Sequence, residues 1–154
     1  MLRFGIKGKS WLTILKKREN YRVAFDDFDS AKVALYDDTK IQELLANPGI
    51  IRNKLKINAA VANAKVVLAI QKEFGSFDKY LWEFVDNKPI VNRFEKMEDF
   101  VATSPISDKI SKDLKKRGCN FVGSTIIYAF MQATGMVNDH FVDCFVYEEL
   151  TGQE

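Results

Sequence analysis

Hydrophobic positions recur every three or four residues along most of the chain, which is the spacing of one face of an α-helix. Gly, Pro and capping residues divide this pattern into short segments, and no segment shows the alternation of a paired strand. The longest segment ends at Gly75 and carries its apolar residues at spacings of three and four: Ile57, Val61, Ala64 and Leu68. The pattern therefore predicts an all-α fold without a strand pair.

Capping residues and helix breakers indicate where the helices begin and end. Asp29 or Ser30 precedes one short helix, and Asp38 or Thr39 precedes the next. We expect helices over about 11–25, 30–35, 39–46, 52–75, 77–85, 108–117 and 126–134, and a final helical turn that holds His140 and Cys144. The stretch 87–105 is expected to be the longest loop.

The size and charge of the chain exclude several classes of protein. Its 154 residues suit one domain, and 23 Lys and Arg against 21 Asp and Glu leave a net charge of +2. Such a balance gives no global argument for nucleic acid, so a DNA-binding function must rest on local clusters. The 2 cysteines cannot form a disulfide scaffold, and no apolar run is long enough to span a bilayer. We expect a cytoplasmic protein with no membrane partner.

The first candidate site is a pair of helices joined by a glycine-containing hairpin. The whole unit spans about residues 40–72. In a helix-hairpin-helix unit, a Gly-containing turn exposes backbone amides at a helix N-terminus, where they can hold a phosphate of DNA. Nearby cations would neutralise further phosphates. The candidate DNA-binding residues are Gly49, Ile50, Arg52, Asn53, Lys54 and Lys56. The alternative is an ordinary turn, because a Pro-Gly stop between helices needs no ligand.

The second candidate site is the pair His140 and Cys144, which are four residues apart. On a helix this spacing puts both side chains on one face, where they could be two ligands of a tetrahedral zinc ion. A complete set would need Cys119 or carboxylates from elsewhere in the chain. The alternative is structural: Cys144 as a small core residue and His140 as a hydrogen-bonded group.

The third candidate is Trp11, which follows Gly8, Lys9 and Ser10. An indole at a helix N-terminus beside a Gly loop could stack on a planar nucleic-acid base. The alternative is that Trp11 belongs to the hydrophobic core. The sequence contains neither a phosphate-binding Gly loop nor a nucleophile elbow.

Several ordered blocks of the sequence resemble the DNA-3-methyladenine glycosylase I family of bacterial base-excision repair enzymes. The blocks follow one another at family-like distances, from about Ser10 to about Cys144. They are Ser10–Arg22, Gly49–Asn53, Ser111–Gly118, Phe121–Gly123, Met131–Ala133 and Val137–Cys144. This resemblance covers nearly the whole chain.

The resemblance implies an all-α helix-hairpin-helix glycosylase bundle that acts on alkylated double-stranded DNA. We expect the protein to be a monomer. The resemblance also implies that a flipped 3-methyladenine is cut from its sugar by hydrolysis of the N-glycosidic bond. In the family, the Trp that matches Trp11 stacks on the base. A structural zinc in the family is bound by a His and a Cys that match His140 and Cys144, together with two N-terminal ligands.

The sequence also departs from the family near its start. Family members have a longer N-terminal segment that carries two zinc ligands, and a base-recognising Glu where this chain has Arg3. We therefore expect a truncated bundle with a divergent stub (1–9), a glycosylase domain (10–146) and a tail (147–154), and weak or no zinc binding. Two hypotheses for the function follow: a 3-methyladenine glycosylase, or a non-catalytic helix-hairpin-helix DNA-binding module or inactive remnant of the enzyme.

Overall fold

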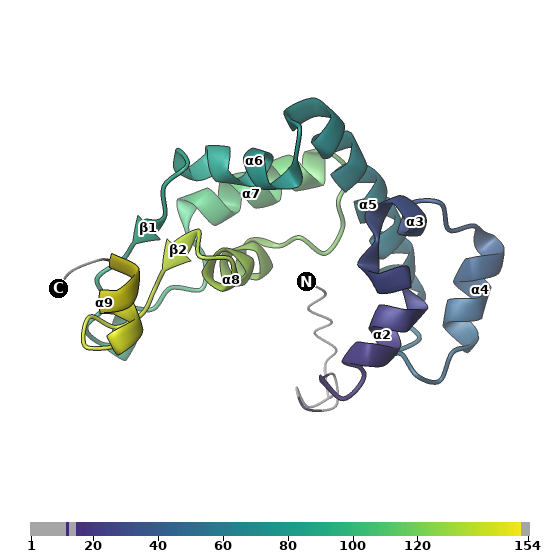
Figure 1. Cartoon of the computed structure of the whole chain (residues 1–154), viewed down its shortest axis with the longest axis horizontal. Helices are drawn as coiled ribbons and strands as arrows, with labels where there is room; N and C mark the ends of the chain where they lie inside the picture. The colour runs from purple at the N-terminus through teal and green to yellow at the C-terminus, as the bar shows by residue number, and fades with distance from the viewer. Residues whose placement is uncertain (1–11, 13–14, 152–154) are drawn as a thin grey trace. The chain divides into compact units, whose positions relative to one another are not determined.

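Helices account for nearly all the regular structure, as the hydrophobic spacing predicts. A computed structural model describes residue 12 and residues 15–151 of the chain (Figure 1). The helices are α2 (Arg18–Ala24), α3 (Ser30–Val33), α4 (Asp38–Ala46), α5 (Lys54–Phe74), α6 (Phe77–Trp82), α7 (Pro105–Lys116), α8 (Ser124–Ala133) and α9 (Phe145–Thr151). Short 3-10 helices cover η1 (Asp26–Phe28), η2 (Glu83–Val85) and η3 (Met97–Asp99). None of the described helices is long and apolar enough to cross a membrane. The predicted all-α class is confirmed.

Side-chain caps explain where several helices begin. Asp29 caps α3 and Ser76 caps α6, each by accepting backbone N–H groups of the first turn. The cap of α4 is Asp37, so the prediction of Asp38 or Thr39 is wrong by at least one residue. Three consecutive polar residues can all cap a helix, and only the backbone conformation selects between them.

Two glycines end helices by adopting a left-handed backbone. Gly75 has a φ of 85° after α5, and Gly118 has a φ of 103° after α7. This region is costly for residues that carry a Cβ, so glycine is the residue of choice where a helix must stop sharply. Both stops are those that the sequence predicts.

A short pair of strands contradicts the expectation of no strand pairing. Strand β1 (Ile90–Val91) lies parallel to β2 (Val137–Asn138), and a bridge between Phe94 and Phe141 extends the pairing. The strand β1 and the bridging Phe94 lie within the predicted loop 87–105. Each strand is too short to show an alternating pattern, and the two partners lie far apart in the sequence.

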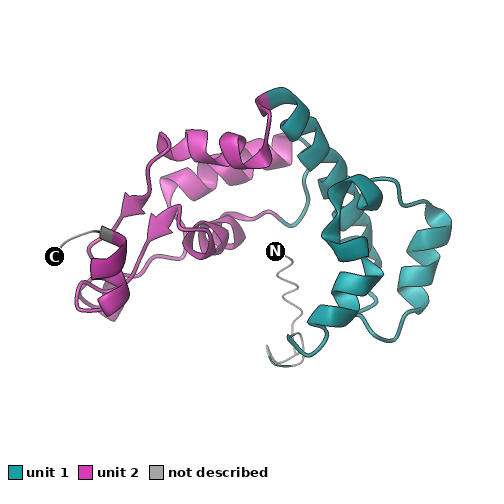
Figure 2. Cartoon of the chain, in the orientation of Figure 1, with its two compact units in different colours: residues 1–73, 117–121 teal, residues 74–116, 122–154 magenta. Residues whose placement is uncertain are grey.

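The chain divides into two compact units, coloured in Figure 2. Unit 1 contains residues 1–73 and 117–121, and unit 2 contains residues 74–116 and 122–154. The short segment 117–121 therefore leaves the helices that flank it in sequence and packs with α5.

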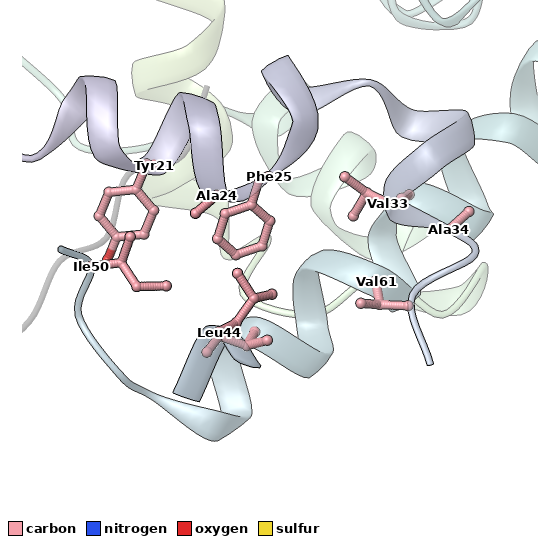
Figure 3. Packing of buried hydrophobic residues seen from close by; sticks show 10 residues of the cluster. Tyr21, Ala24, Phe25, Val33, Ala34, Leu44, Ile50 and Val61 are labelled. Atoms are coloured by element: carbon pink, nitrogen blue, oxygen red, sulfur yellow. The ribbon is translucent and has the colours of Figure 1, made fainter. Parts of the chain in front are cut away.

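Unit 1 has a hydrophobic core formed by α2, α3, α4 and the first half of α5 (Figure 3). Phe25 and Leu44 are each 1% exposed at its centre, and Ile57 of α5 is 2% exposed. Ile50 of the hairpin is also buried, so the hairpin between α4 and α5 is attached directly to this core. Burying aliphatic and aromatic side chains typically contributes about 1.5–3 kcal/mol each.

Unit 2 is built on the packing of α7 against α8. Ile110 and Met131 are fully buried, and Tyr80 of α6 donates a hydrogen bond to Asp113 of α7 at 2.8 Å. Helix α7 begins at Pro105 rather than at the predicted residue 108. Ser107, the residue before the predicted start, is buried and shares a hydrogen bond of 2.7 Å with Ser124.

Candidate nucleic-acid interface

The hairpin between α4 and α5 is held by side chains from the start of α2. The ammonium group of Lys17 donates hydrogen bonds to the carbonyl oxygens of Pro48 at 3.1 Å and Gly49 at 3.0 Å. The side-chain amide of Asn20 donates a further bond to the Gly49 carbonyl at 3.1 Å. The carbonyl oxygens of Pro48 and Gly49 in the turn are therefore occupied by hydrogen bonds from side chains of the same protein.

Two backbone amides of the hairpin are also bound inside the protein. The Gly49 N–H donates to Oδ1 of Asn47 at 2.8 Å, and the Ile51 N–H donates to the hydroxyl of Tyr21 at 2.9 Å. A Cβ on residue 49 would lie 2.9 Å from that Asn47 oxygen, which is too close for a side chain. A side chain at residue 49 would therefore displace the Asn47 side chain from this hydrogen bond, and the Gly49 amide does not point to a ligand.

The start of α5 is where the hairpin presents amide groups. The side chain of Asn53 caps this helix by accepting the Lys56 N–H at 3.1 Å. The first N–H groups of an α-helix lack partners within the helix, and the helix dipole adds partial positive charge at the same end. The amides of Lys54 and Leu55 in the first turn therefore form the anion-attracting end of the hairpin.

The charges at the start of α5 oppose the usual pattern of a helix. Acidic residues stabilise the first turn of a helix, and α4, α6 and α7 each carry an Asp there. The first turn of α5 has no acidic residue and instead contains Lys54 and Lys56, directly after Arg52. A bound phosphate would convert this unfavourable arrangement into a favourable one.

The three cations differ in their surroundings. Arg52 and Lys54 are exposed and form no ion pair with the residues that the structure describes. Lys56 is half-buried, with its ammonium nitrogen 5.6 Å from the centre of the Phe121 ring. Burial lowers the pKa of Lys56. The exposed pair is consequently free to meet phosphates, and Lys56 is partly covered.

His140 and Cys144 lie close together, although not as predicted. The Nδ1 atom of His140 is 3.8 Å from the Sγ atom of Cys144. Two tetrahedral ligands with typical zinc bond lengths are about 3.6 Å apart, so the pair fits two ligands of one zinc ion. Among the residues described, no group of three or more His, Cys, Asp or Glu side chains could hold a metal ion.

The backbone that carries this pair is a turn and not the predicted helical face. The Oδ1 atom of Asn138 accepts the His140 N–H at 3.1 Å, and Phe141 forms a strand-type bridge, so helix α9 begins only at Phe145. Such side-chain bonds to the backbone compete with helix formation. The prediction that His140 and Cys144 share a helix face is wrong. Their side chains nevertheless lie close together, as that prediction implied.

A buried carboxylate next to His140 supports this turn. Asp139 is 8% exposed and accepts hydrogen bonds from Asn92 at 2.6 Å and Gln132 at 2.8 Å. Burial and the nearby Asp139 raise the pKa of the Tyr128 hydroxyl, which therefore stays protonated. The sequence indicated Asp139, with Asn138, only as a cap of the predicted helical turn. Its buried hydrogen bonds were not predicted, because the partners come from a distant loop and from α8.

Trp11 and Arg3 lie outside the residues that the structure describes. The roles of Trp11, the hairpin residues and the zinc ligands thus remain predictions.

A family match and similar solved structures place this helical fold among the all-α helix-hairpin-helix DNA glycosylases. A sequence model of the methyladenine glycosylase family matches residues 1–147. The chain belongs to the methyladenine glycosylase family.

Characterised relatives are similar over most of the chain. DNA-3-methyladenine glycosylase 1 of Escherichia coli is 44% identical over 140 residues, which cover 91% of this chain and 75% of the relative. DNA-3-methyladenine glycosylase of Haemophilus influenzae is 45% identical over 137 residues, covering 89% of this chain and 74% of the relative.

Solved structures agree with this assignment. A crystal structure of a 3-methyladenine DNA glycosylase I superposes with a TM-score of 0.81 at 46% identity, over 90% of this chain and 76% of that chain. The Staphylococcus aureus glycosylase I, solved to explain its recognition of 3-methyladenine, superposes with a TM-score of 0.83 at 38% identity, over 90% of this chain and 74% of that chain.

Proposed function

We propose that this chain is a DNA-3-methyladenine glycosylase, which hydrolyses the bond between a flipped 3-methyladenine and its deoxyribose in alkylated DNA. The observation that carries this proposal is the family match over residues 1–147, joined to fold similarity at 38–46% identity with solved 3-methyladenine glycosylases. One similar solved structure shows a 3-methyladenine DNA glycosylase I in complex with 3-methyladenine itself.

The chemistry requires little proton transfer by the protein. Methylation at N3 makes the adenine cationic, so the base becomes neutral when it leaves with the electron pair of the glycosidic bond. Water then supplies the oxygen that bonds to C1′ of the sugar, and its proton goes to solvent. The protein must therefore extrude the nucleotide, hold the base and tolerate positive charge on the sugar. Trp11 is the residue that we assign to base stacking.

The hairpin supplies the grip on the DNA backbone in this proposal. A phosphate at the start of α5 would accept from the first-turn amides and lie near the exposed cations Arg52 and Lys54. Ile50, which is 3% exposed, anchors the turn in the core of unit 1, and Asn53 caps the helix. The turn is thus rigid before DNA arrives, which lowers the entropy cost of binding.

His140 and Cys144 would hold a zinc ion, if one binds, as two of its ligands. A zinc ion held by this pair would supply a structural link within the turn 140–144. Because the described residues provide only this pair, we expect weaker binding than at a four-ligand site. Competition with a coloured chelator measures that affinity, and His140→Ala should abolish what zinc binding there is.

A base-release assay tests the proposed activity. Methylated duplex DNA is incubated with the protein at high concentration, and free 3-methyladenine is measured by chromatography against samples with heat-unfolded protein and with none. Release above both controls supports the enzyme. Absence of release would refute the enzymatic activity. DNA binding without release would then support the non-catalytic module, and absence of both would support an inactive remnant.

The same preparation tests two finer expectations, that the protein is a monomer and that its substrate is double-stranded. Sedimentation analysis should give a mass near 17.6 kDa. Release from the duplex should exceed release from the same strand without its complement.

A further inference from the structure

Phe121 is a large apolar residue that the fold leaves exposed at an unfavourable backbone angle. Its side chain is 53% exposed, and its φ is 57°, in the left-handed region that bulky L residues rarely adopt. The backbone angle raises the free energy of the folded state, and the exposed ring does not gain the stabilisation that burial would give. Phe28 shares both features, so the surroundings of Phe121, and not its strain or exposure alone, must indicate whether the ring has a role outside the core.

The residue before Phe121 is fixed to α5 by two hydrogen bonds. Oδ1 of Asn63 accepts the Asn120 N–H at 2.8 Å, and Nδ2 of Asn63 donates to the Asn120 carbonyl at 3.0 Å. The segment 117–121 therefore belongs to unit 1, although α7 and α8 flank it in sequence (Figure 2). The position of Phe121 relative to α5 is set by this pairing.

The ring of Phe121 lies beside the ammonium group of Lys56, which belongs to the first turn of α5. The Lys56 ammonium is 5.6 Å from the ring centre, and Lys54 and Arg52 are the exposed cations of the same helix end. An exposed aromatic ring next to cations suits a ligand that carries both negative charge and flat apolar faces. A nucleotide of DNA has both: its phosphate meets the cations, and its base or sugar meets the ring.

We propose that Phe121 is an aromatic contact for DNA, packing on a nucleotide adjacent to the phosphate held at the start of α5. This inference rests on the proposed function, since it assigns a further residue to the same DNA interface. The contact is apolar and displaces few counterions, so it adds affinity without adding to the salt dependence of binding.

The test is the affinity for a fluorescent duplex that carries a stable abasic-site analogue, measured over a range of salt concentrations. Phe121→Gly removes the ring and suits the left-handed backbone, so the fold is kept, as thermal unfolding will show. We expect its affinity to fall about 5- to 150-fold, the loss of one stacked base, with an unchanged salt slope. Phe121→Tyr should retain the wild-type affinity.

Phe28 provides a matched control. It is also an exposed phenylalanine with a positive φ, of 60°, but its ring packs on Phe25. Phe28→Gly should leave the affinity within about 2-fold of the wild type, below the range of a stacking contact.

Three results would overturn the inference. Wild-type affinity in Phe121→Gly would show that the ring does not touch DNA, and a reduced salt slope would show that Phe121 acts only by positioning Lys56. If the wild type were to self-associate and Phe121→Gly did not, the ring would instead contact a second copy of the chain. If the wild-type protein itself does not bind the duplex, the proposed function fails. If the wild type binds and Phe121→Gly binds equally well, only the role of Phe121 fails.

Discussion

The sharpest test of the hairpin assignment is removal of its two exposed cations. Arg52→Ala combined with Lys54→Ala deletes positive charge that forms no ion pair with any described residue. The first-turn Lys54 opposes the dipole of α5, so its loss should raise the free energy of unfolding slightly, by about 0.3–1 kcal/mol. A drop in DNA affinity could then not be explained by unfolding.

The size of the expected effect follows from counterion release. If each cation neutralises one phosphate, the slope of log affinity against log salt concentration becomes shallower by about 1.8 in the double variant. Raising the salt from about 50 to 200 mM would weaken the wild type about 12-fold more than the variant. If the two affinities converge at about 1 M salt, the variant should bind about 60-fold more weakly than the wild type at about 0.1 M salt.

Fluorescence anisotropy with a labelled duplex at several salt concentrations measures both quantities. Lys109→Ala combined with Lys112→Ala is a charge-matched control, because it removes two exposed lysines from α7 in the other unit. The control should keep most of the salt slope. Equal slopes for the two double variants would refute the assignment of the hairpin as the DNA grip.

Three further predictions test the packing and the titratable groups. Tyr21→Phe leaves the Ile51 N–H without its acceptor and should lower the free energy of unfolding by about 1–3 kcal/mol; an unchanged urea midpoint would contradict this. Two backbone N–H donors lower the pKa of Asp99, so its stabilisation is present at neutral pH and is lost as the pH falls below about 4. The difference in urea midpoint between wild type and Asp99→Asn should therefore vanish in acid, and a constant difference would exclude this carboxylate as the cause. Burial raises the pKa of the Cys119 thiol, so iodoacetamide should modify the half-buried Cys144 first, as peptide mapping would show; equal rates would mean that Cys119 is accessible.

Local signals in the sequence were sufficient for the helical class and for many helix ends. The glycine stops at Gly75 and Gly118 and the caps at Asp29 and Ser76 act through neighbouring residues, so their effect can be read from a short window. The resemblance to methyladenine glycosylases also rested on sequence alone, and the family match confirms it. The start of α4 at Asp38, capped by Asp37, was missed because three adjacent residues were equally suitable caps.

The tertiary structure decided the features that join residues far apart in the chain. The pairing of β1 with β2 prevents the helical turn predicted at His140 and brings this side chain to Cys144 by a different route. Hydrogen bonds between Asn63 and Asn120 attach the segment of Phe121 to the middle of α5, which no pattern in either segment indicates. Periodicity and capping depend on contacts within a few residues, whereas these arrangements depend on which distant surfaces meet when the chain packs.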